Sequence, residues 1–265
     1  MPTPISELKS SDVQGLEGVL FDIDDTLTRD GRLEAVAYDA LWRLYAYDLR
    51  LIALTGRPWG FAHVVAQHWP VDIAVAENGA CWVAKQGSRL IEGQCDSCPK
   101  ESNRILAEIQ KRVKETLPHV SVTRDHAMRR YDLAFDIGEY ATLPEADLLS
   151  LENIVEACGA TVLKSTVHLH AQPEPWDKAQ GACRAAEAVL GLDLMRDREH
   201  WMFVGDSPND AAAFSFFPLS VGVANVAPYL PDLPHPPRFI TEADRGSGFA
   251  ECAHTVISRL AARSD

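Results

Sequence analysis

Residues 19–28 read VLFDIDDTLT, and their composition changes abruptly halfway along. An apolar run of the kind that fills a buried strand stops at three carboxylates, Asp22, Asp24 and Asp25. Like charges at this spacing repel one another, so their position at a strand end needs a physical reason. Either the three are solvated loop residues, or they hold a cation that makes the crowding favourable.

Four further apolar runs end in polar or glycine-rich turns: LIALTG (51–56), DIAVAENG (72–79), WMFVGD (201–206) and LSVGVAN (219–225). Short runs without alternation are typical of parallel strands that helices cover on both faces. Helical patterns lie between them, for example at residues 32–49 and 177–191. Strand–helix–strand alternation predicts the α/β class, with a doubly wound, Rossmann-like parallel sheet.

Residues 81–172 have a different pattern. Residues 102–117 form an amphipathic helical pattern, while residues 129–137 and 161–172 alternate like half-exposed strands. Such a segment predicts an inserted α+β domain with one sheet face on a helical layer and the other face open. We therefore expect a core domain of residues 1–80 and 173–265, and a cap domain of residues 81–172.

The overall composition limits the possible function classes. The chain has 265 residues, of which 46% are hydrophobic, and a formal net charge of −13. This acidity argues against nucleic acid as the main partner, because phosphate backbones attract clustered Lys and Arg. No stretch approaches the roughly 20 apolar residues of a membrane span, and the N-terminal residues lack a secretory signal. We expect a cytoplasmic monomer or homodimer.

The six cysteines are too few for a disulfide scaffold in a chain of this length, which agrees with a reducing compartment. Cys95 and Cys98 form a CxxC pair, which is either half of a zinc or redox site or a surface turn. Because no second CxxC and no His pair at finger spacing follow, the surface turn is favoured.

The carboxyl ends of the apolar runs carry polar residues. In open α/β sheets ligands bind beyond these ends, so the clusters are expected to meet at one edge of the sheet. Asp22, Asp24 and Asp206 would then place three negative charges in a small volume, which an octahedral Mg²⁺ with oxygen ligands can balance. Lys178 and the Thr55-Gly56 hydroxyl and amides are suited to bind the oxygens of a phosphate.

This assembly predicts phosphoryl transfer, in which positioning and charge stabilisation supply most of the rate. An Asp carboxylate is a known covalent nucleophile toward phosphorus. A second Asp two residues further along an extended segment lies on the same face and can protonate the leaving oxygen. The Asp22-x-Asp24 spacing fits these two roles.

The chain resembles the haloacid-dehalogenase-like (HAD) superfamily of phosphohydrolases. The matching residues occur in order across the whole chain: Asp22-Ile-Asp24-Asp-Thr26 as motif one, Thr55 in LTGR as motif two, Lys178 as motif three, and Gly205-Asp206-Ser-Pro-Asn209-Asp210 as motif four. Glu77-Asn78-Gly79-Ala80 and the insert that follows are similar to the subclass with a C2, type IIB cap. That subclass includes Cof-like, sucrose-phosphate, trehalose-phosphate and mannosylphosphoglycerate phosphatases and eukaryotic phosphomannomutase.

The resemblance implies a role for each motif residue. Asp22 is expected to be the nucleophile and Asp24 the general acid/base. The expected Mg²⁺ ligands are the Asp22 side chain, the Asp24 carbonyl and Asp206, with Asp210 in support. The residues expected to bind the phosphoryl group or substrate are Thr55, Gly56, Arg57, Lys178 and Asn209.

Two positions depart from the family pattern, Asp25 and Ala179, since Lys178 is followed by Ala179 where many relatives have glycine. Asp25 stands where glycine is common in the family, and we expect it to be structural because its side chain points away from the face of Asp24. Arg57 has two open interpretations, a local salt bridge or contact with substrate. In the cap, His168 and His170 are expected to lie with Lys164 on the open sheet face, where they would roof the active site and contact substrate.

The predicted function is a Mg²⁺-dependent phosphomonoester hydrolase that acts through an aspartyl-phosphate on a small sugar phosphate or related metabolite. Two alternatives stay open, a phosphosugar mutase and a non-catalytic protein that binds phosphorylated metabolites. A dehalogenase is disfavoured, because those enzymes lack the second motif-one Asp, which is present here as Asp24.

Overall fold

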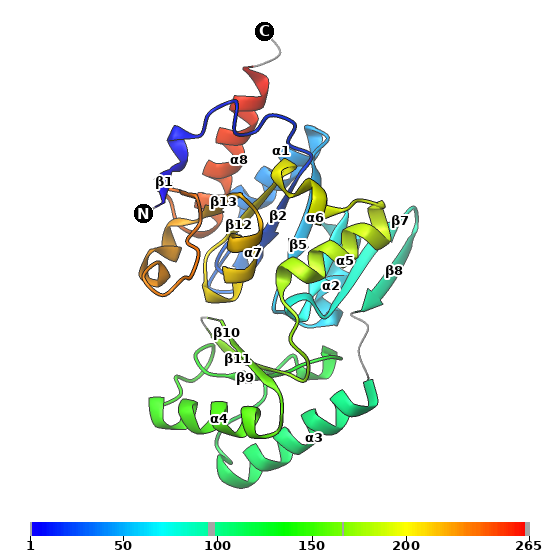
Figure 1. Ribbon diagram of the computed structural model, residues 1–265, viewed down its shortest axis with the longest axis vertical. Coiled ribbons are helices and arrows are strands. Elements are labelled where there is room, and N and C mark those ends of the chain that lie inside the picture. Colours follow the sequence, from blue (N-terminus) through cyan, green and yellow to red (C-terminus); the bar gives the residue numbers. More distant parts are fainter. Residues whose placement is uncertain (1, 95–98, 166, 263–265) are drawn as a thin grey trace.

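The computed structural model describes residues 2–94, 99–165 and 167–262. It has two parts, a large core domain and a smaller cap that lies at one end of the core (Figure 1). The predicted CxxC turn at residues 95–98 lies outside the described residues. No helix in the described ranges is long and apolar enough to cross a membrane.

The core is built on a nine-stranded sheet of order β1-β14-β13-β12-β2-β5-β6-β7-β8. The central strands are parallel and buried on both faces, as the apolar runs predict. The parallel strands are β2 Gly18–Asp22, β5 Arg50–Leu54, β6 Ile73–Ala76, β12 Trp201–Gly205, β13 Leu219–Gly222 and β14 Phe239–Ile240, with β1 Thr3–Pro4 at the edge of the sheet. A separate small hairpin pairs β3 Thr28–Arg29 with β4 Arg32–Leu33.

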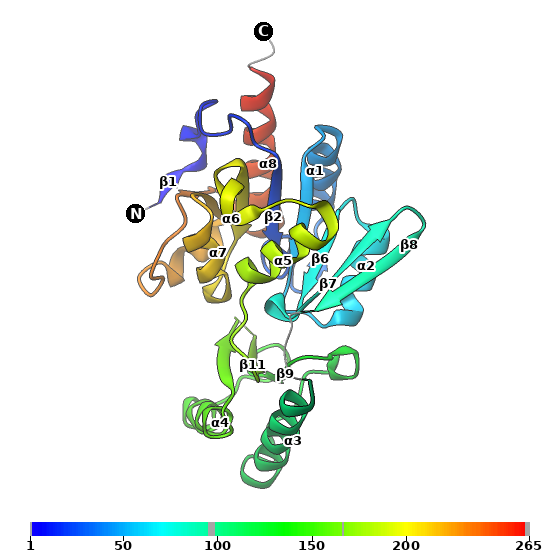
Figure 2. The same ribbon diagram turned by 45° about the vertical axis from the view of Figure 1, so that its right-hand side comes forward.

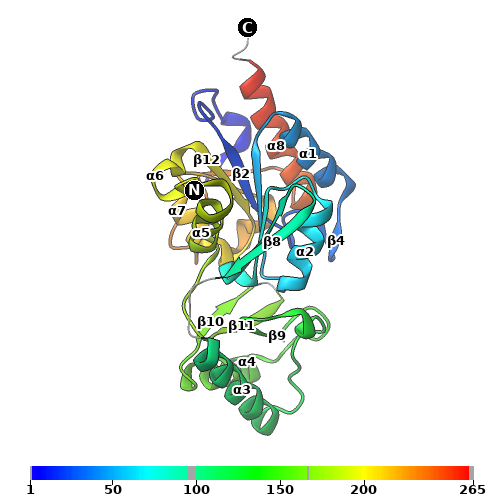
Figure 3. The ribbon, with the colours of Figure 1, turned by 90° about the vertical axis from the view of Figure 1, so that its right-hand side faces the viewer.

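Helices cover both faces of this sheet, with two separate apolar layers (Figure 3). One layer packs α1 (Ala35–Ala46), α2 (Trp59–His68) and α8 (Arg245–Ala261) on residues such as Val19 and Phe21 of β2. The other packs α5 (Lys178–Leu190), α6 (Leu194–Asp197) and α7 (Ala211–Phe216) on residues such as Leu20. Successive side chains of one strand thus enter opposite layers, which gives the doubly wound architecture.

The boundary between core and cap differs from the predicted one at residue 81. β7 (Cys81–Gln86) pairs antiparallel with β6, and β8 (Arg89–Gln94) pairs antiparallel with β7, so both extend the core sheet. Backbone pairing with β6 holds this hairpin on the core, although it follows the third parallel strand and precedes the insert. Residues 81–94 therefore belong to the core domain.

The cap is an α+β unit, as predicted. Its antiparallel sheet has the order β10-β11-β9, with β9 at Leu133–Asp136, β10 at Thr161–Lys164 and β11 at His168–Gln172. Helices α3 (Pro99–Thr116) and α4 (Glu145–Ala157) cover one face of this sheet through a shared apolar cluster. The other face is turned toward the core (Figures 1 and 2).

The strand register in the cap corrects part of the predicted face assignment. Leu163 pairs with His170 and Lys164 pairs with Leu169, so Leu163 shares the face of His170 while Lys164 does not. The alternation is interrupted at the β10–β11 turn, where Ser165 N donates to the His168 carbonyl. Lys164 instead binds Glu152 of α4 at 2.8 Å, away from the face that meets the core.

Candidate active site

Three buried carboxylates meet at the carboxyl edge of the core sheet. Asp22 ends β2, Asp206 follows β12, and Asp210 ends the single 3₁₀ turn Pro208–Asp210. Because β2 and β12 are neighbouring parallel strands, residues at their carboxyl ends lie side by side. One oxygen from each carboxylate lies within 4.8 Å of the others. The structure therefore brings together three of the four predicted metal ligands.

Lys178 is buried against this acidic cluster (Asp22, Asp206 and Asp210). Its Nζ lies 2.5 Å from Asp22 Oδ1 and 2.7 Å from Asp210 Oδ1. The lysine occupies the first position of α5, where Asp177 caps the helix by accepting from Gln180 N at 2.8 Å. Burial alone lowers the pKa of Lys178, but the charges of Asp210 and Asp22 outweigh burial and hold the pKa above its usual range.

The acidic cluster carries more negative charge than Lys178 balances. Burial, with the charges of Asp210 and Asp24, raises the pKa of Asp22 from 3.8 to about 8 against the opposing effect of Lys178. Burial and the charge of Asp22 also raise the pKa of Asp206 well above its ordinary value. Oxygen ligands with a charge excess are the donor set that Mg²⁺ prefers, so these residues fit that ion.

Asp210 has a supporting role in this cluster. Its Oδ2 accepts from the backbone N–H groups of Asp206 and Ser207 at 2.9 and 3.1 Å, and its Oδ1 accepts from Lys178. Asp206 in turn accepts from Thr26 Oγ1 at 3.1 Å and Asn225 Nδ2 at 3.0 Å. In contrast, Asp22 Oδ2 makes no hydrogen bond within the described part of the chain. The arrangement leaves Asp22 as the carboxylate with a free oxygen.

The Asp24 carboxylate lies outside the acidic cluster and is held by Arg57. Arg57 Nε donates to Asp24 Oδ1 at 3.0 Å and to Oδ2 at 3.1 Å, while Nη2 donates to Oδ1 at 2.9 Å. Thr55 Oγ1 lies 3.4 Å from Asp24 Oδ2. Of the two interpretations left open for Arg57, the structure shows the local salt bridge.

The predicted phosphate-binding residues surround the same strand ends. Thr55 follows β5 directly, and its Oγ1 accepts from Arg57 N at 3.0 Å. Asn209 accepts from Ser207 Oγ at 2.7 Å and donates to Asn78 Oδ1 at 3.4 Å. Gly56 lies close to the Asn78 side chain that Asn209 contacts, because a Cβ added at Gly56 would be 3.1 Å from Asn78 Oδ1. Motifs two and four therefore meet here.

Asp25 is the motif-one carboxylate that does not join Asp22 and Asp24. Its φ of +56° lies in the left-handed region that favours glycine, which explains why a glycine suits this position. Its Oδ1 accepts from Arg245 Nε at 2.9 Å. The predicted structural role agrees with this conformation and with this ion pair.

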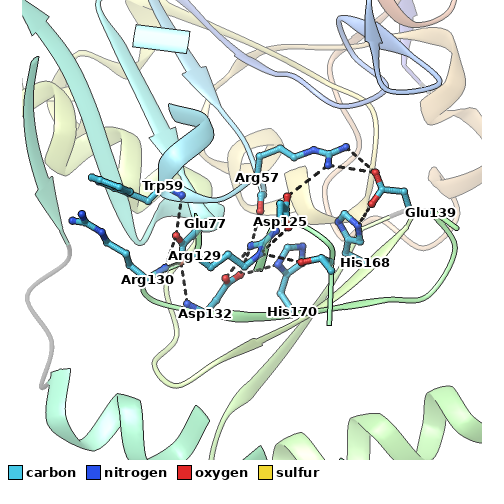
Figure 4. Close-up of polar contacts among 12 residues, drawn as sticks. Arg57, Trp59, Glu77, Asp125, Arg129, Arg130, Asp132, Glu139, His168 and His170 are labelled. Carbon is cyan, nitrogen blue, oxygen red and sulfur yellow. Dashed lines mark hydrogen bonds and ion pairs between the residues drawn. The ribbon is translucent and has the colours of Figure 1, made fainter. Parts of the chain in front are cut away.

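His168 and His170 are buried at the junction of cap and core, in contrast to the open face predicted for them. His168 Nε2 lies 2.8 Å from Glu139 Oε2, and His170 Nδ1 lies 2.8 Å from Asp132 Oδ2 (Figure 4). Because the core covers this face of the cap sheet, both rings are enclosed and pair with carboxylates. Burial lowers the pKa of His170. Their contact with substrate stays a prediction.

Glu77 joins the two domains and was not among the predicted site residues. Its fully buried carboxylate accepts backbone N–H groups from Trp59 in the core, at 2.9 Å, and from residues 130, 131 and 132 in the cap, at 2.7–3.3 Å. Its own carbonyl accepts from Trp176 Nε1 at 2.9 Å in the connection back to the core. The sequence indicates that Glu77 follows a buried strand, but not that its carboxylate accepts backbone N–H groups from the cap.

A cavity of about 690 Å³ opens between the core and the cap beside Asp24. Carboxylates outnumber cations in its wall, which includes Asp24, Asp25, Asp30, Arg57, Asp125, Glu139 and Arg245. The aromatic side chains of Phe61 and Tyr140 complete part of the lining. The cavity has the size and the mixed lining of a site for a small polar molecule.

Known proteins resemble the chain in sequence and in fold. It is 28% identical over 236 residues to the phosphoglycolate phosphatase of Haloarcula marismortui, covering 88% of this chain and 94% of that protein. Its structure is similar to Thermoplasma acidophilum 0175, with a TM-score of 0.72 and 18% identity over 91% of this chain and 98% of that one. A HAD subclass IIB sugar phosphatase gives a TM-score of 0.60 and 15% identity, covering 93% and 99%. No protein-family model matches the chain.

Sequence similarity and fold lead to one conclusion. The core sheet places the four motifs at one edge, and an α+β cap is inserted after β8, as in the fold of the subclass IIB sugar phosphatase. The sequence relative is itself named a phosphatase. The chain therefore has the fold of a HAD subclass IIB sugar phosphatase, with an α+β cap, and is similar in sequence to a phosphoglycolate phosphatase.

Proposed function

We propose that the protein is a Mg²⁺-dependent phosphomonoester hydrolase that works through an aspartyl-phosphate on Asp22. The observation that carries this proposal is the buried cluster in which Asp22, Asp206 and Asp210 converge beside the ammonium of Lys178. A cation and three carboxylates at one strand edge support this proposal, because such groups suit a divalent metal and a phosphoryl group.

In the first step, Asp22 Oδ2 attacks the phosphorus atom and the bond from phosphorus to the ester oxygen breaks. Asp24 gives its proton to the leaving oxygen, for which Arg57 must shift from the position that it now holds on the Asp24 carboxylate. Lys178 and the Thr55 hydroxyl stabilise the negative charge on the phosphoryl oxygens. Mg²⁺, held by Asp22, the Asp24 carbonyl and Asp206, would supply further charge stabilisation.

In the second step, Asp24 takes a proton from water, and the water oxygen attacks the phosphorus of the aspartyl-phosphate. The bond between phosphorus and Asp22 Oδ2 then breaks, which releases inorganic phosphate, restores the Asp22 carboxylate and leaves Asp24 protonated for the next cycle. Asp24 lies in the wall of the cavity between core and cap, so water in that cavity can reach the proposed general base.

The cavity wall favours a sugar phosphate among small phosphate esters. The carboxylates of Asp24, Asp125 and Glu139 can accept hydrogen bonds from the hydroxyls of a sugar, whereas they repel a second carboxylate. Phosphoglycolate is the second candidate, because the sequence relative is named for it. The two leaving groups differ in charge, and kinetics separate them readily.

The test begins with hydrolysis of p-nitrophenyl phosphate in Mg²⁺ and in EDTA. We expect release of inorganic phosphate that depends on Mg²⁺, and equal rates in EDTA would contradict the proposal. A panel of hexose phosphates, pentose phosphates and phosphoglycolate then ranks substrates by kcat/KM. Isomerised sugar phosphate without released phosphate would instead show a mutase.

A further inference from the structure

We propose that Arg129, a buried cap residue, is a positioning residue for residues 55–57 of the core. These residues contain motif two and are called the phosphate-binding loop below. The inference rests on the proposed function, since it assigns the cap a part in building the phosphoryl site. It concerns a contact across the domain junction, where the Arg129 side chain reaches the backbone of motif two (Figure 4).

The contact itself is short and enclosed. Arg129 Nη1 donates to the carbonyl oxygen of Gly56 at 3.0 Å, and the guanidinium is fully buried. The same nitrogen donates to Asp132 Oδ1 at 2.9 Å, and Nε lies 3.6 Å from Asp125 Oδ1. A buried charged donor that hydrogen-bonds to a backbone carbonyl fixes the orientation of that peptide group.

The Gly56 carbonyl belongs to the peptide group that precedes Arg57. The N–H of this same peptide donates to Thr55 Oγ1 at 3.0 Å. Because the Thr55 oxygen already accepts this bond, its own proton is directed away from the peptide. It donates to Asp24 Oδ2 at 3.4 Å in this structure, and a phosphoryl oxygen bound there would take the place of that acceptor. Arg129 thus holds one side of the peptide, and the other side sets the direction of the Thr55 hydroxyl.

A second layer of contacts holds Arg129 in place. The buried carboxylate of Asp132 receives both Arg129 and His170 Nδ1, the latter at 2.8 Å. The backbone N–H of Asp132 donates to Glu77 at 3.0 Å, so the cap segment that carries Arg129 is attached to the core. Asp132 is negatively charged and pairs with both Arg129 and His170. It therefore holds the Arg129 guanidinium in the position from which it reaches the Gly56 carbonyl.

The neighbouring Arg130 provides a natural comparison. It also lies at the domain junction, with its guanidinium stacked 3.2 Å above the Trp59 ring and 3.4 Å from Glu92 Oε1. Its side chain is 43% exposed, whereas that of Arg129 is fully buried. None of its described contacts involves the motif-two backbone, so Arg130 contributes to the junction without touching the phosphate-binding loop.

The experiment measures the affinity for inorganic phosphate in the presence of Mg²⁺ by titration calorimetry. Arg129→Met is compared with the wild type and with Arg130→Met as the matched control. We expect phosphate binding to weaken roughly tenfold in Arg129→Met, the effect of one charge-assisted hydrogen bond. Arg130→Met should stay within about twofold of the wild type, because an exposed junction contact does not reach the loop.

Two more variants separate the Gly56 contact from the loss of a buried ion pair. Arg129→Met/Asp132→Asn removes both charges, so it avoids an unpaired buried carboxylate and keeps the test decisive if the single variant fails to fold. We expect the same weakening of phosphate binding in this double variant. Arg129→Lys retains a cationic donor and should bind phosphate more tightly than Arg129→Met does.

Phosphate affinity equal to the wild type in the double variant, or an equal loss in Arg130→Met, would overturn the role of Arg129. Kinetics on p-nitrophenyl phosphate add an independent readout, in which we expect KM to rise together with a fall in kcat. A merely structural role predicts a lower melting temperature with unchanged phosphate affinity. A wild type that binds phosphate without hydrolysing the ester contradicts the proposed function alone.

Discussion

The ammonium nitrogen of Lys178 lies 2.5 Å from Asp22 Oδ1, and both side chains are buried at the carboxyl edge of the core sheet. This pair joins the first and third motifs, which lie 156 residues apart in the chain. It also places a positive charge directly beside the proposed nucleophile, where this charge can contact the phosphoryl oxygens of a substrate.

Replacing this lysine by an apolar residue of similar length tests its part in the site. For Lys178→Met we expect kcat/KM for an aryl phosphate to fall at least roughly 100-fold, because a preorganised charge on the phosphoryl group is lost. Unpaired buried carboxylates should also lower stability by about 3–5 kcal/mol without metal. Lys164→Met is the matched control, since this lysine is exposed in the cap and binds Glu152. Full activity in Lys178→Met would contradict the assignment.

The raised pKa of Asp22 predicts an opposite pH dependence with and without metal. Its pKa in the metal-free fold, about 8, exceeds the ordinary 3.8, so folding favours the protonated form. This stabilising contribution is complete below 3.8 and is lost as pH rises through 8. Mg²⁺ requires the ionised form, so the rise in melting temperature on adding Mg²⁺ should grow between pH 6 and pH 9. An equal Mg²⁺ effect at both pH values would contradict this.

Asp24 and Asp25 are adjacent but should respond very differently to substitution. In Asp25→Gly the backbone keeps its positive φ without the strain that a side chain causes there, which stabilises the fold by about 1 kcal/mol. This gain offsets the loss of the partly exposed ion pair with Arg245. We expect kcat/KM within about threefold of the wild type. Asp24→Asn removes the proposed general acid/base and should reduce hydrolysis of an alkyl phosphate by roughly 100-fold or more. Comparable losses in both variants would show that Asp25 also takes part in the chemistry.

Glu77 should contribute mainly to the attachment of the cap. Glu77→Gln places an NH₂ group among four backbone N–H donors, so at least one buried donor loses its acceptor. We expect a loss of about 2–4 kcal/mol in the free energy of unfolding, measured by chemical denaturation. The matched control is Glu92→Gln, a half-exposed carboxylate at the same junction, with an effect near zero. An equal effect of the two substitutions would refute the role of Glu77.

The core could be predicted because parallel strands leave a direct signature. Buried runs such as residues 19–22 and 201–205 have no alternation, and their carboxyl ends must share one edge of the sheet. Placing Asp22 near Asp206 therefore follows from this shared edge and from motif order, whereas the direct pairing of β2 with β12 is known from the structure. The structural role expected for Asp25 agrees with the structure, but the extended segment assumed for it does not, since residues 24–27 form a turn and Asp25 has a φ of +56°.

The junction between core and cap could not be predicted in the same way. Pairing of β7 with β6 depends on backbone hydrogen bonds that no side-chain pattern encodes, so the boundary was placed 14 residues too early, before residues 81–94. The buried state of His168 and His170 depends on how the cap is set against the core. Arg129 and Glu77 meet the opposite domain through backbone groups, which carry no sequence signal.

The most direct test of the central claim is the rate of phosphate release by Asp22→Asn in saturating Mg²⁺. An amide in this position cannot attack phosphorus, while its size and fold contacts are nearly unchanged. We predict that hydrolysis of p-nitrophenyl phosphate falls to background in this variant, while the wild type forms a phosphoenzyme that intact-mass spectrometry detects after rapid acid quench. Hydrolysis by Asp22→Asn at the rate of the wild type would contradict the account.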